Sequence, residues 1–427
     1  MQPVKLTIEG KFWDTQVYMG FLYLFARDGS LVVIDWDRLI NDLGHRTNQL
    51  FATEAALRRS DHLYGPSARM FLNDPEVKAV VLNHFETLAR TELYVDRFAL
   101  ERFVVQHTVS PSPFPHADSV LYNSLLYTVG RSGVYCSPCE TLRKGTPVGE
   151  GVRRWDGPAS ACSASYNTVA LATGESGLFE MISGSAYRGE LQIPKTEPRL
   201  IVEKHCTDCS WSFFNIFGTS RQSGSFLVQY KLNRDRRDRR EPESPEELEE
   251  GEWATELEEA MRPDVPRRTF ERVIEERELF GGDSNGYEIA YQNKLYRVLD
   301  RRISIVRANP YAKDVDKRLS TFGEVRIEHW KGSLVSAKAA VFGVVLEYDE
   351  ALVVIGTGSD DNPETHTVPG EPVSWRVFPR SANYRNHLHV IRDDALEVWS
   401  FNHDYFVDQN NKKMGTRYSD VSGWRGR

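Results

Sequence analysis

The sequence predicts an all-β fold of seven repeated units, and three observations carry this prediction. Seven tight turns separate paired runs of apolar and β-branched residues: Asp28-Gly29, Ser132-Gly133, Ser176-Gly177, Ser223-Gly224, Asp300-Arg301, Asp349-Glu350 and Asp393-Asp394. An Asn or Gly heads each unit, at Gly20, Asn123, Asn167, Asn215, Asn293, Gly343 and Asn386. Four of the six intervals between the turns are 44, 47, 49 and 44 residues. Repeats of this length are typical of propeller blades, so we predict a seven-bladed β-propeller spanning residues 1–427 as a single domain.

Each unit has the local chemistry of an antiparallel meander. Asp-Gly and Ser-Gly between alternating apolar runs favour two-residue hairpins, because Gly adopts positive φ without steric cost. The Asn or Gly at the head of the unit suits a second tight turn for the same reason. Another strand-like stretch precedes that turn, as in Phe12–Tyr18 and Ser119–Tyr122. Every unit is therefore at least three-stranded, and such meanders bury both faces only when they pack radially.

The two ends of the chain are expected to meet in the last blade. Val4–Gly10 reads as a strand that belongs to no repeat, and Leu388–Phe401 contains the last predicted hairpin. Closing a ring with strands from both termini removes exposed sheet edges. We therefore predict that Val4–Gly10 pairs beside the last blade.

Residues 37–90 interrupt the repeat and read as a helical insertion. Asp74-Pro75-Glu76 combines an N-cap residue, a proline at the first helical position and an early acidic residue. Apolar residues follow at helical spacing, at Val77, Val80, Val81, Phe85 and Leu88. The segment 48–63 has a helical pattern too. A helical hairpin on the rim or face of the propeller would either shield strand edges or bind a partner.

Residues 233–268 form a second insertion of unusual composition. Five arginines within 234–240 precede ten glutamates within 241–259. Such like-charge blocks usually stay solvated and mobile. Ser244-Pro245-Glu246-Glu247 is nevertheless a capping box, after which Trp253, Leu257 and Met261 share one stripe of a helix. The insertion is either a charged loop without a specific role, a protease-sensitive tether, or a docking peptide anchored by these three side chains.

Four of the five cysteines form two C-x-x-C pairs, Cys136 with Cys139 and Cys206 with Cys209. Such pairs are typical of structural zinc sites. The predicted register separates them, because Cys136 falls late in the second unit and Cys206 early in the fourth. Two interpretations stay open: one structural zinc shared by all four cysteines, or reduced thiols near the central channel. No other cofactor is predicted.

Two common catalytic motifs are absent from the sequence, which contains no H-E-x-x-H and no P-loop. His387 and His389 lie along one predicted strand with Asn386 and are expected to straddle the sheet as structural side chains. We assign no catalytic residue.

Composition and charge limit the classes of partner that the chain is expected to bind. The 427-residue chain is 40% hydrophobic and has a formal net charge of −8, so it lacks the basic surplus of a nucleic-acid binder. Its first residues have no apolar signal core, and no apolar run is long enough to span a membrane. We expect a cytoplasmic protein with protein partners.

The arrangement resembles the seven-bladed β-propellers and, loosely, the WD-repeat proteins. The resemblance covers nearly all of the chain outside the insertions, through the hairpins above and through strand endings such as Val33–Trp36 and Glu397–Trp399. No repeat unit carries the Gly-His dipeptide, and among the predicted hairpins only the first is followed by Trp-Asp, at Trp36-Asp37. A divergent propeller outside the WD-repeat family is therefore indicated. The resemblance implies a rigid platform whose loop faces bind other proteins, and it identifies no partner.

Two function classes follow. The favoured one is a non-catalytic interaction scaffold, an accessory subunit of a bacterial multiprotein system that binds through loop faces and insertions. The alternative is a propeller enzyme or small-ligand binder at the mouth of the axial channel. The alternative requires acidic or histidine side chains from several blades to converge at the channel.

Overall fold

The computed structural model describes residues 2–60, 74–139, 147–187, 190–194, 196–232, 268–281, 286–309, 318–356 and 363–401. The chain divides into two compact units. Unit 1 comprises Met1–Phe114, Gly145–Pro147 and Phe280–Arg427, and unit 2 comprises Pro115–Lys144 and Val148–Leu279.

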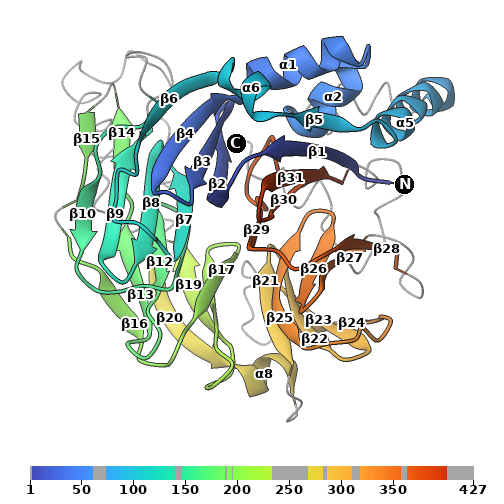
Figure 1. The fold of residues 1–427 in the computed structure, drawn as a ribbon. Coiled ribbons are helices and arrows are strands. Elements are labelled where there is room, and N and C mark those ends of the chain that lie inside the picture. Colours follow the sequence, from blue (N-terminus) through green and yellow to red (C-terminus); the bar gives the residue numbers. More distant parts are fainter. Residues whose placement is uncertain are drawn as a thin grey trace, which may run out of the picture. The chain divides into compact units, whose positions relative to one another are not determined.

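Unit 1 holds four sheets (Figure 1). The first has the order β2-β3-β4-β6, formed by Phe12–Tyr18, Phe21–Ala26, Ser30–Asp35 and Val104–Val109. The second is β21-β22-β23-β24, formed by Tyr287–Tyr291, Lys294–Leu299, Arg302–Ala308 and Leu319–Arg326. The third is β25-β26-β27-β28, formed by Leu334–Ala340, Gly343–Tyr348, Ala351–Gly356 and Thr365–Pro369. The fourth is β29-β30-β31-β1-β5, formed by Ser374–Val377, His387–Ile391, Ala395–Ser400, Val4–Glu9 and Leu93–Val95.

Unit 2 holds three sheets of the same kind and one small ribbon. The sheet β10-β9-β8-β7 is formed by Val152–Trp155, Gly133–Pro138, Leu125–Gly130 and Asp118–Tyr122. The sheet β11-β12-β13-β16 is formed by Ala161–Ser165, Thr168–Ala172, Leu178–Ile182 and Arg199–Val202. The sheet β17-β18-β19-β20 is formed by Asp208–Ser212, Asn215–Thr219, Phe226–Leu232 and Arg268–Glu275. The ribbon pairs β14 (Ser185–Tyr187) with β15 (Glu190–Gln192), and the short helix α8 (Glu276–Phe280) follows β20.

The seven sheets correspond one for one to the seven predicted repeats, and each contains the predicted antiparallel hairpin. The fold is therefore the predicted seven-bladed β-propeller. In the described residues six blades have four strands and the closing blade has five, where the predicted minimum was three. The central strands are buried along their whole length, as in β8, β12 and β30. These strands form the apolar cores between neighbouring blades.

The predicted turn residues adopt positive φ in only some blades: Asn215 lies on β18, and Phe213 has the positive φ of that turn instead. Asn123 and Asn167 adopt positive φ at the first turn of their blades. Gly177 has φ +98° in the second turn of its blade, and a Cβ there would lie 2.2 Å from the carbonyl oxygen of Val202. Only Gly tolerates this approach of backbone to backbone. The last blade differs from the prediction, because residues 378–386 separate β29 from β30 and Asn386 lies at the end of this longer connection.

The predicted closure of the ring is confirmed. β1 pairs antiparallel with β31, from Val4 opposite Ser400 to Glu9 opposite Ala395. Figure 1 shows β1 beside β31, although the two strands come from opposite ends of the sequence. On its other edge β1 pairs in parallel with β5, with Leu6 opposite Leu93. The closing blade therefore contains three separate parts of the chain.

Helices fill much of the first insertion, as predicted. Asp74 caps α5 (Pro75–Ala89) by accepting hydrogen bonds from the backbone N–H groups of Glu76 and Val77. α2 (Leu50–Leu57) ends earlier than the expected segment 48–63, of which residues 61–63 lie outside the described part of the chain. A further helix, α1 (Trp36–Arg46), begins after the N-cap Asp35. The insertion then continues beyond residue 90 through β5 and α6 (Arg97–Glu101) before β6.

The predicted apolar stripe of α5 is only partly buried. Phe85 and Leu88 are buried, whereas Val77 and Val80 are exposed. Helical spacing placed all of these residues on one stripe, but the N-terminal half of α5 has little to pack against among the described residues.

The second insertion leaves the sheet after β19 and returns at β20. Leu232 and Arg268, its two flanking residues, lie opposite each other in this hairpin. Residues 233–267 lie outside the described residues, and so do the predicted anchors Trp253, Leu257 and Met261.

Candidate functional site

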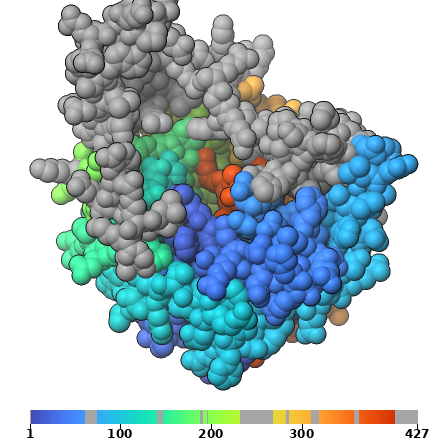
Figure 2. Space-filling model, turned by 90° about the horizontal axis from the view of Figure 1, so that it is seen from above, coloured from blue at the N-terminus to red at the C-terminus, as the bar shows by residue number. Residues whose placement is uncertain are grey.

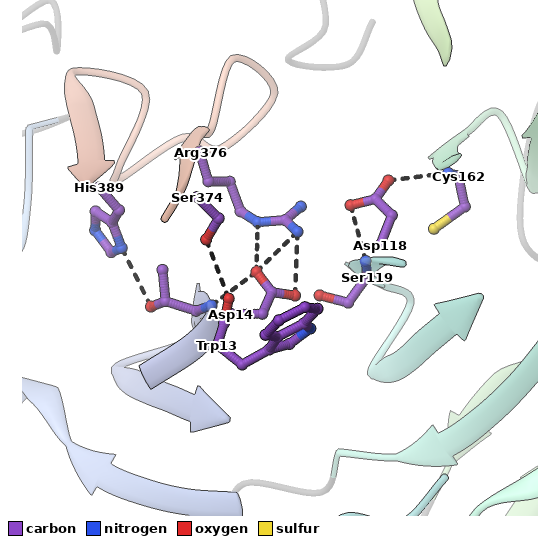
Figure 3. Close-up of polar contacts among 9 residues, drawn as sticks. Trp13, Asp14, Asp118, Ser119, Cys162, Ser374, Arg376 and His389 are labelled. Carbon is purple, nitrogen blue, oxygen red and sulfur yellow. Dashed lines mark hydrogen bonds and ion pairs between the residues drawn. The ribbon is translucent and has the colours of Figure 1, made fainter. Parts of the chain in front are cut away.

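A charged pair joins the first strand of one blade to the first strand of the closing blade in unit 1. The guanidinium of Arg376 on β29 donates to both carboxylate oxygens of Asp14 on β2, with Nη2 at 2.9 Å from Oδ1 and 3.1 Å from Oδ2. Ser374 Oγ, also on β29, donates to the backbone carbonyl of Trp13 at 3.0 Å. Figure 3 shows these contacts converging from the two strands. The side chains of Arg376 and Asp14 are 17% and 10% exposed, so solvent reaches the pair only in part.

Two stacked histidines lie next to this pair. His387 and His389 project from the same face of β30, with ring centroids 5.6 Å apart, and both are fully buried. His389 Nδ1 lies 3.3 Å from the hydroxyl of Thr15. The expectation that the histidines straddle the sheet was wrong, because residues two apart on a strand share a face. Their expected structural role agrees with their burial.

Burial also sets the charge of these histidines. Loss of water lowers the pKa of His387 to about 4, and the hydrogen bond to the Ala56 carbonyl offsets part of this shift. Burial lowers the pKa of His389 well below its usual range, with His387 and Arg376 adding to the effect. Both rings are neutral at pH 7, which leaves them as hydrogen-bonding groups rather than charged ones.

In unit 2, aspartates occupy equivalent positions of two first strands. Asp118 on β7 accepts hydrogen bonds from the N–H groups of Ser119 and Cys162 at 2.8 and 2.9 Å (Figure 3). Asp208 on β17 accepts one from the N–H of Cys209 at 2.8 Å. Asp118 thereby ties its blade to the next one. In both places the carboxylate satisfies backbone donors.

Another buried ion pair, this one in unit 2, lies where the second insertion returns to the sheet. Glu180 accepts from Arg268 Nη2 at 2.8 Å, from Tyr230 Oη at 2.7 Å and from Arg199 Nη2 at 2.5 Å. The Arg268 guanidinium also lies 3.7 Å from the ring centre of Tyr230 and 4.6 Å from that of Trp211. Buried charges are tolerated when they are paired in this way. The ion pair therefore holds Arg268 in place, directly after the second insertion.

The charged pairs, together with Asp118 and Asp208, find partners within the chain and join neighbouring strands and blades. No sequence pattern indicated the Asp14–Arg376 pair, because 362 residues separate its members. An Asp at the same register of several first strands, at Asp14, Asp118 and Asp208, is a repeat-level signal that could have indicated it.

The structure places the predicted zinc ligands in different sheets. Cys136 lies on β9, and Cys139 just after it, whereas Cys206 precedes β17 and Cys209 lies on it. All four are buried free thiols. Burial raises the pKa of Cys136, that of Cys206 to about 12, and that of Cys209 well above its usual range. Across the described parts of the chain, no three His, Cys, Asp or Glu side chains are grouped so that they could hold a metal ion.

Apolar side chains on the surface are the remaining candidates for a functional site. The largest exposed fractions belong to Phe98 on α6, at 86%, and Val109 on β6, at 78%. Figure 2 shows the helical insertion in blue and the cyan residues that follow it on the surface of unit 1. None of the described helices is both long and apolar enough to span a bilayer.

No protein-family model matches the sequence, and no curated protein matches it. Among solved structures, the computationally designed Ika8 protein is similar over 94% of this chain and 100% of its own, with 10% identity and a TM-score of 0.44. BBS1N, solved in complex with ARL6DN, is similar over 94% of this chain and 98% of its own, with 5% identity and a TM-score of 0.46.

Proposed function

We propose that this chain is a non-catalytic interaction scaffold, an accessory subunit of a bacterial multiprotein system. One observation supports it most: half of the exposed large hydrophobic side chains in the described residues fall within 51–109. They are Phe51, Val77, Val80, Tyr94, Phe98, Val105 and Val109. Exposed apolar side chains are frequent in binding surfaces, and aromatic ones are frequent hot spots.

The polar groups of the blades support the same role. The ion pairs Asp14–Arg376 and Glu180–Arg268 hold strands in place within their units, and in each pair the two opposite charges neutralise each other. Neutral, buried histidines complete this framework. A rigid platform lowers the entropy cost of binding at its surface.

The alternative of a small-ligand binder or enzyme would use the Asp14–Arg376 pair, which solvent reaches in part. A ligand would have to displace one member of a bidentate ion pair, and such charge-assisted pairs are strong. The scaffold is therefore the better-supported proposal.

The test begins with tagged, full-length protein purified from its native host. We expect a stoichiometric protein partner, which is then purified and titrated against Phe98→Asp. Loss of an aromatic hot spot should weaken binding at least about tenfold. Val335→Asp, which changes an exposed Val on β25, is the matched control and should stay within about twofold of the parent protein, as expected of a residue outside the hot spots.

Equal binding by Phe98→Asp and the parent would remove α6 from the interface. The second insertion then becomes the proposed binding element, with Trp253, Leu257 and Met261 as anchors, and Trp253→Ala tests it in the same titration. Purification without any stoichiometric partner would contradict the scaffold proposal.

A further inference from the structure

The closing blade caps the C-terminal end of α2. The carbonyl oxygen of Ala56, in the last turn of this helix, accepts hydrogen bonds from three groups of the closing blade: Asn386 Nδ2 at 3.0 Å, His387 Nε2 at 3.0 Å and Ser400 Oγ at 2.7 Å. Carbonyls in the last turn of a helix have no partner within the helix and need one outside it. The closing blade supplies that partner.

Further contacts fasten the same end of α2. Ser60 donates from its N–H and from its hydroxyl to the carbonyl of Asn383, at 3.2 and 2.8 Å. Trp36 Nε1, from α1, donates to the carbonyl of Leu57 at 2.6 Å. The end of α2 is thus held between α1 and the connection that precedes β30.

His387 is the ionisable member of this contact. A carbonyl only accepts, so Nε2 carries the imidazole proton and Nδ1 is unprotonated. Nδ1 is buried and has no hydrogen-bond partner among the described residues. A second proton would therefore place a cation where nothing described accepts its hydrogen bond, at a large cost in free energy.

The charged and titratable groups around the ring are few. Within β30 the ring stacks on His389, and the rings of Tyr384 and of Trp36 on α1 lie 5.6 and 6.5 Å away. Arg376 of β29 and Asp14 of β2 act on His389 rather than on His387. Asp37, Arg58 and Arg59 of the insertion act on the Tyr384 hydroxyl, which accepts a hydrogen bond from the Gly20 N–H.

We propose that His387 makes α2 a proton-sensitive latch on the closing blade, so that proton uptake favours a state in which α2 has left β30 and the imidazole reaches water. The ring contacts the Ala56 carbonyl of α2 and lies 6.5 Å from the Trp36 ring of α1, so we expect it to reach water when α2 leaves. His389 contacts Thr15 and Phe378 instead and is expected to stay buried.

The expected pH dependence follows from linkage. The open state binds a proton near the ordinary histidine pKa, about 6.5, whereas burial lowers the pKa of closed His387 to about 4. Between these values the open state holds one more proton than the closed state. The opening constant of α2 should therefore rise about tenfold for each pH unit of acidification.

Hydrogen–deuterium exchange of the full-length protein measures the opening equilibrium of α2 directly. Rates for α2 are compared with those for β8 between pH 7 and 5, each corrected for the intrinsic pH dependence of amide exchange. We expect the protection of α2 to fall about tenfold from pH 6 to 5, as one linked proton requires, and to stay below that of β8, because α2 opens without unfolding of the blades. Protection of α2 that equals that of β8, or that does not change with pH, would overturn the proposal, whatever the variants do.

Two variants sharpen the test. The amide of His387→Gln can still donate to Ala56 but takes up no proton, so the pH dependence of α2 exchange should vanish. His84→Gln, on an exposed position of α5, should leave it unchanged. A full tenfold slope in His387→Gln would show that another group drives the opening.

Discussion

The two insertions meet the propeller in opposite ways. The first passes through α1, α2 and α5 and gives the closing blade its fifth strand, β5, together with the helix end that Asn386, His387 and Ser400 cap. The second leaves and re-enters through one hairpin, where Leu232 lies opposite Arg268. The first insertion therefore supplies a strand of a blade. The blade that carries the second insertion has all four of its strands without that insertion.

The difference shows what decides whether an insertion can be removed. An insertion whose two ends are neighbours in a sheet costs only loop-closure entropy, which grows slowly with length. An insertion that returns buried strands and helices to the core contributes apolar burial, and Phe85, Leu88, Leu93 and Val95 belong to the same core cluster as β1. Stability changes in the first insertion should then be much larger than in the second.

The largest effect is expected from deleting residues 2–10. The deletion removes β1, whose Val4, Leu6 and Ile8 are buried and together contribute on the order of 5 kcal/mol. It also exposes the facing edges of β31 and β5. The melting temperature measured by calorimetry should fall by at least several degrees. Thr7→Ser, which keeps the strand, is the control; an unchanged melting curve after the deletion would mean that β1 does not close the ring.

A single substitution in β5 should have the next largest effect. Leu93 is buried opposite Leu6, and Leu93→Ala should cost about 2–5 kcal/mol in denaturant unfolding. Its neighbour Tyr94 is exposed, so Tyr94→Ala should cost less than about 1 kcal/mol. Similar losses for both variants would show that β5 is not packed on the closing blade.

The buried histidines predict a loss of stability in acid. Their folded-state pKa values are lowered, so the unfolded chain binds the extra protons once the pH falls below about 6.5. The free energy of unfolding should drop by about 1 kcal/mol for each histidine between pH 6.5 and 5.5, because the unfolded imidazole is half protonated at the upper end of this range. His389→Gln should remove one of these two contributions, and His45→Gln, at an exposed position, neither. A pH-independent free energy over this range would contradict the burial of both rings.

Metal content should have the smallest effect on stability. The two C-x-x-C pairs lie in different sheets, and burial raises the thiol pKa of three of the four cysteines. Reduced thiols are the interpretation that this placement favours, so elemental analysis should give background zinc and Cys139→Ser should unfold like the parent. One equivalent of zinc that is lost in Cys139→Ser would establish the shared site instead.

Local chemistry made much of this fold predictable. The Asp-Gly and Ser-Gly turns fixed the hairpins because Gly adopts positive φ, and Asp74-Pro75 marked the start of α5. Contacts between residues far apart in the sequence could not be predicted from such local signals. Arg376 meets Asp14, and Ala56 meets His387, only because the ends of the chain share a blade, and no periodic pattern encodes which side chains then face each other.

Replacing each insertion in turn is the most direct measurement of this contrast. In one variant a short Gly-Ser linker replaces residues 234–266, and in the other it replaces residues 50–95, followed in both by thermal unfolding. The first should melt within about a degree of the parent, since closing a loop differs by only about 0.6 kcal/mol per doubling of length. The second should lose its cooperative transition, because it lacks β5 and the helix that the closing blade caps. Unfolding of the first variant, or a parent-like melting curve of the second, would contradict this account.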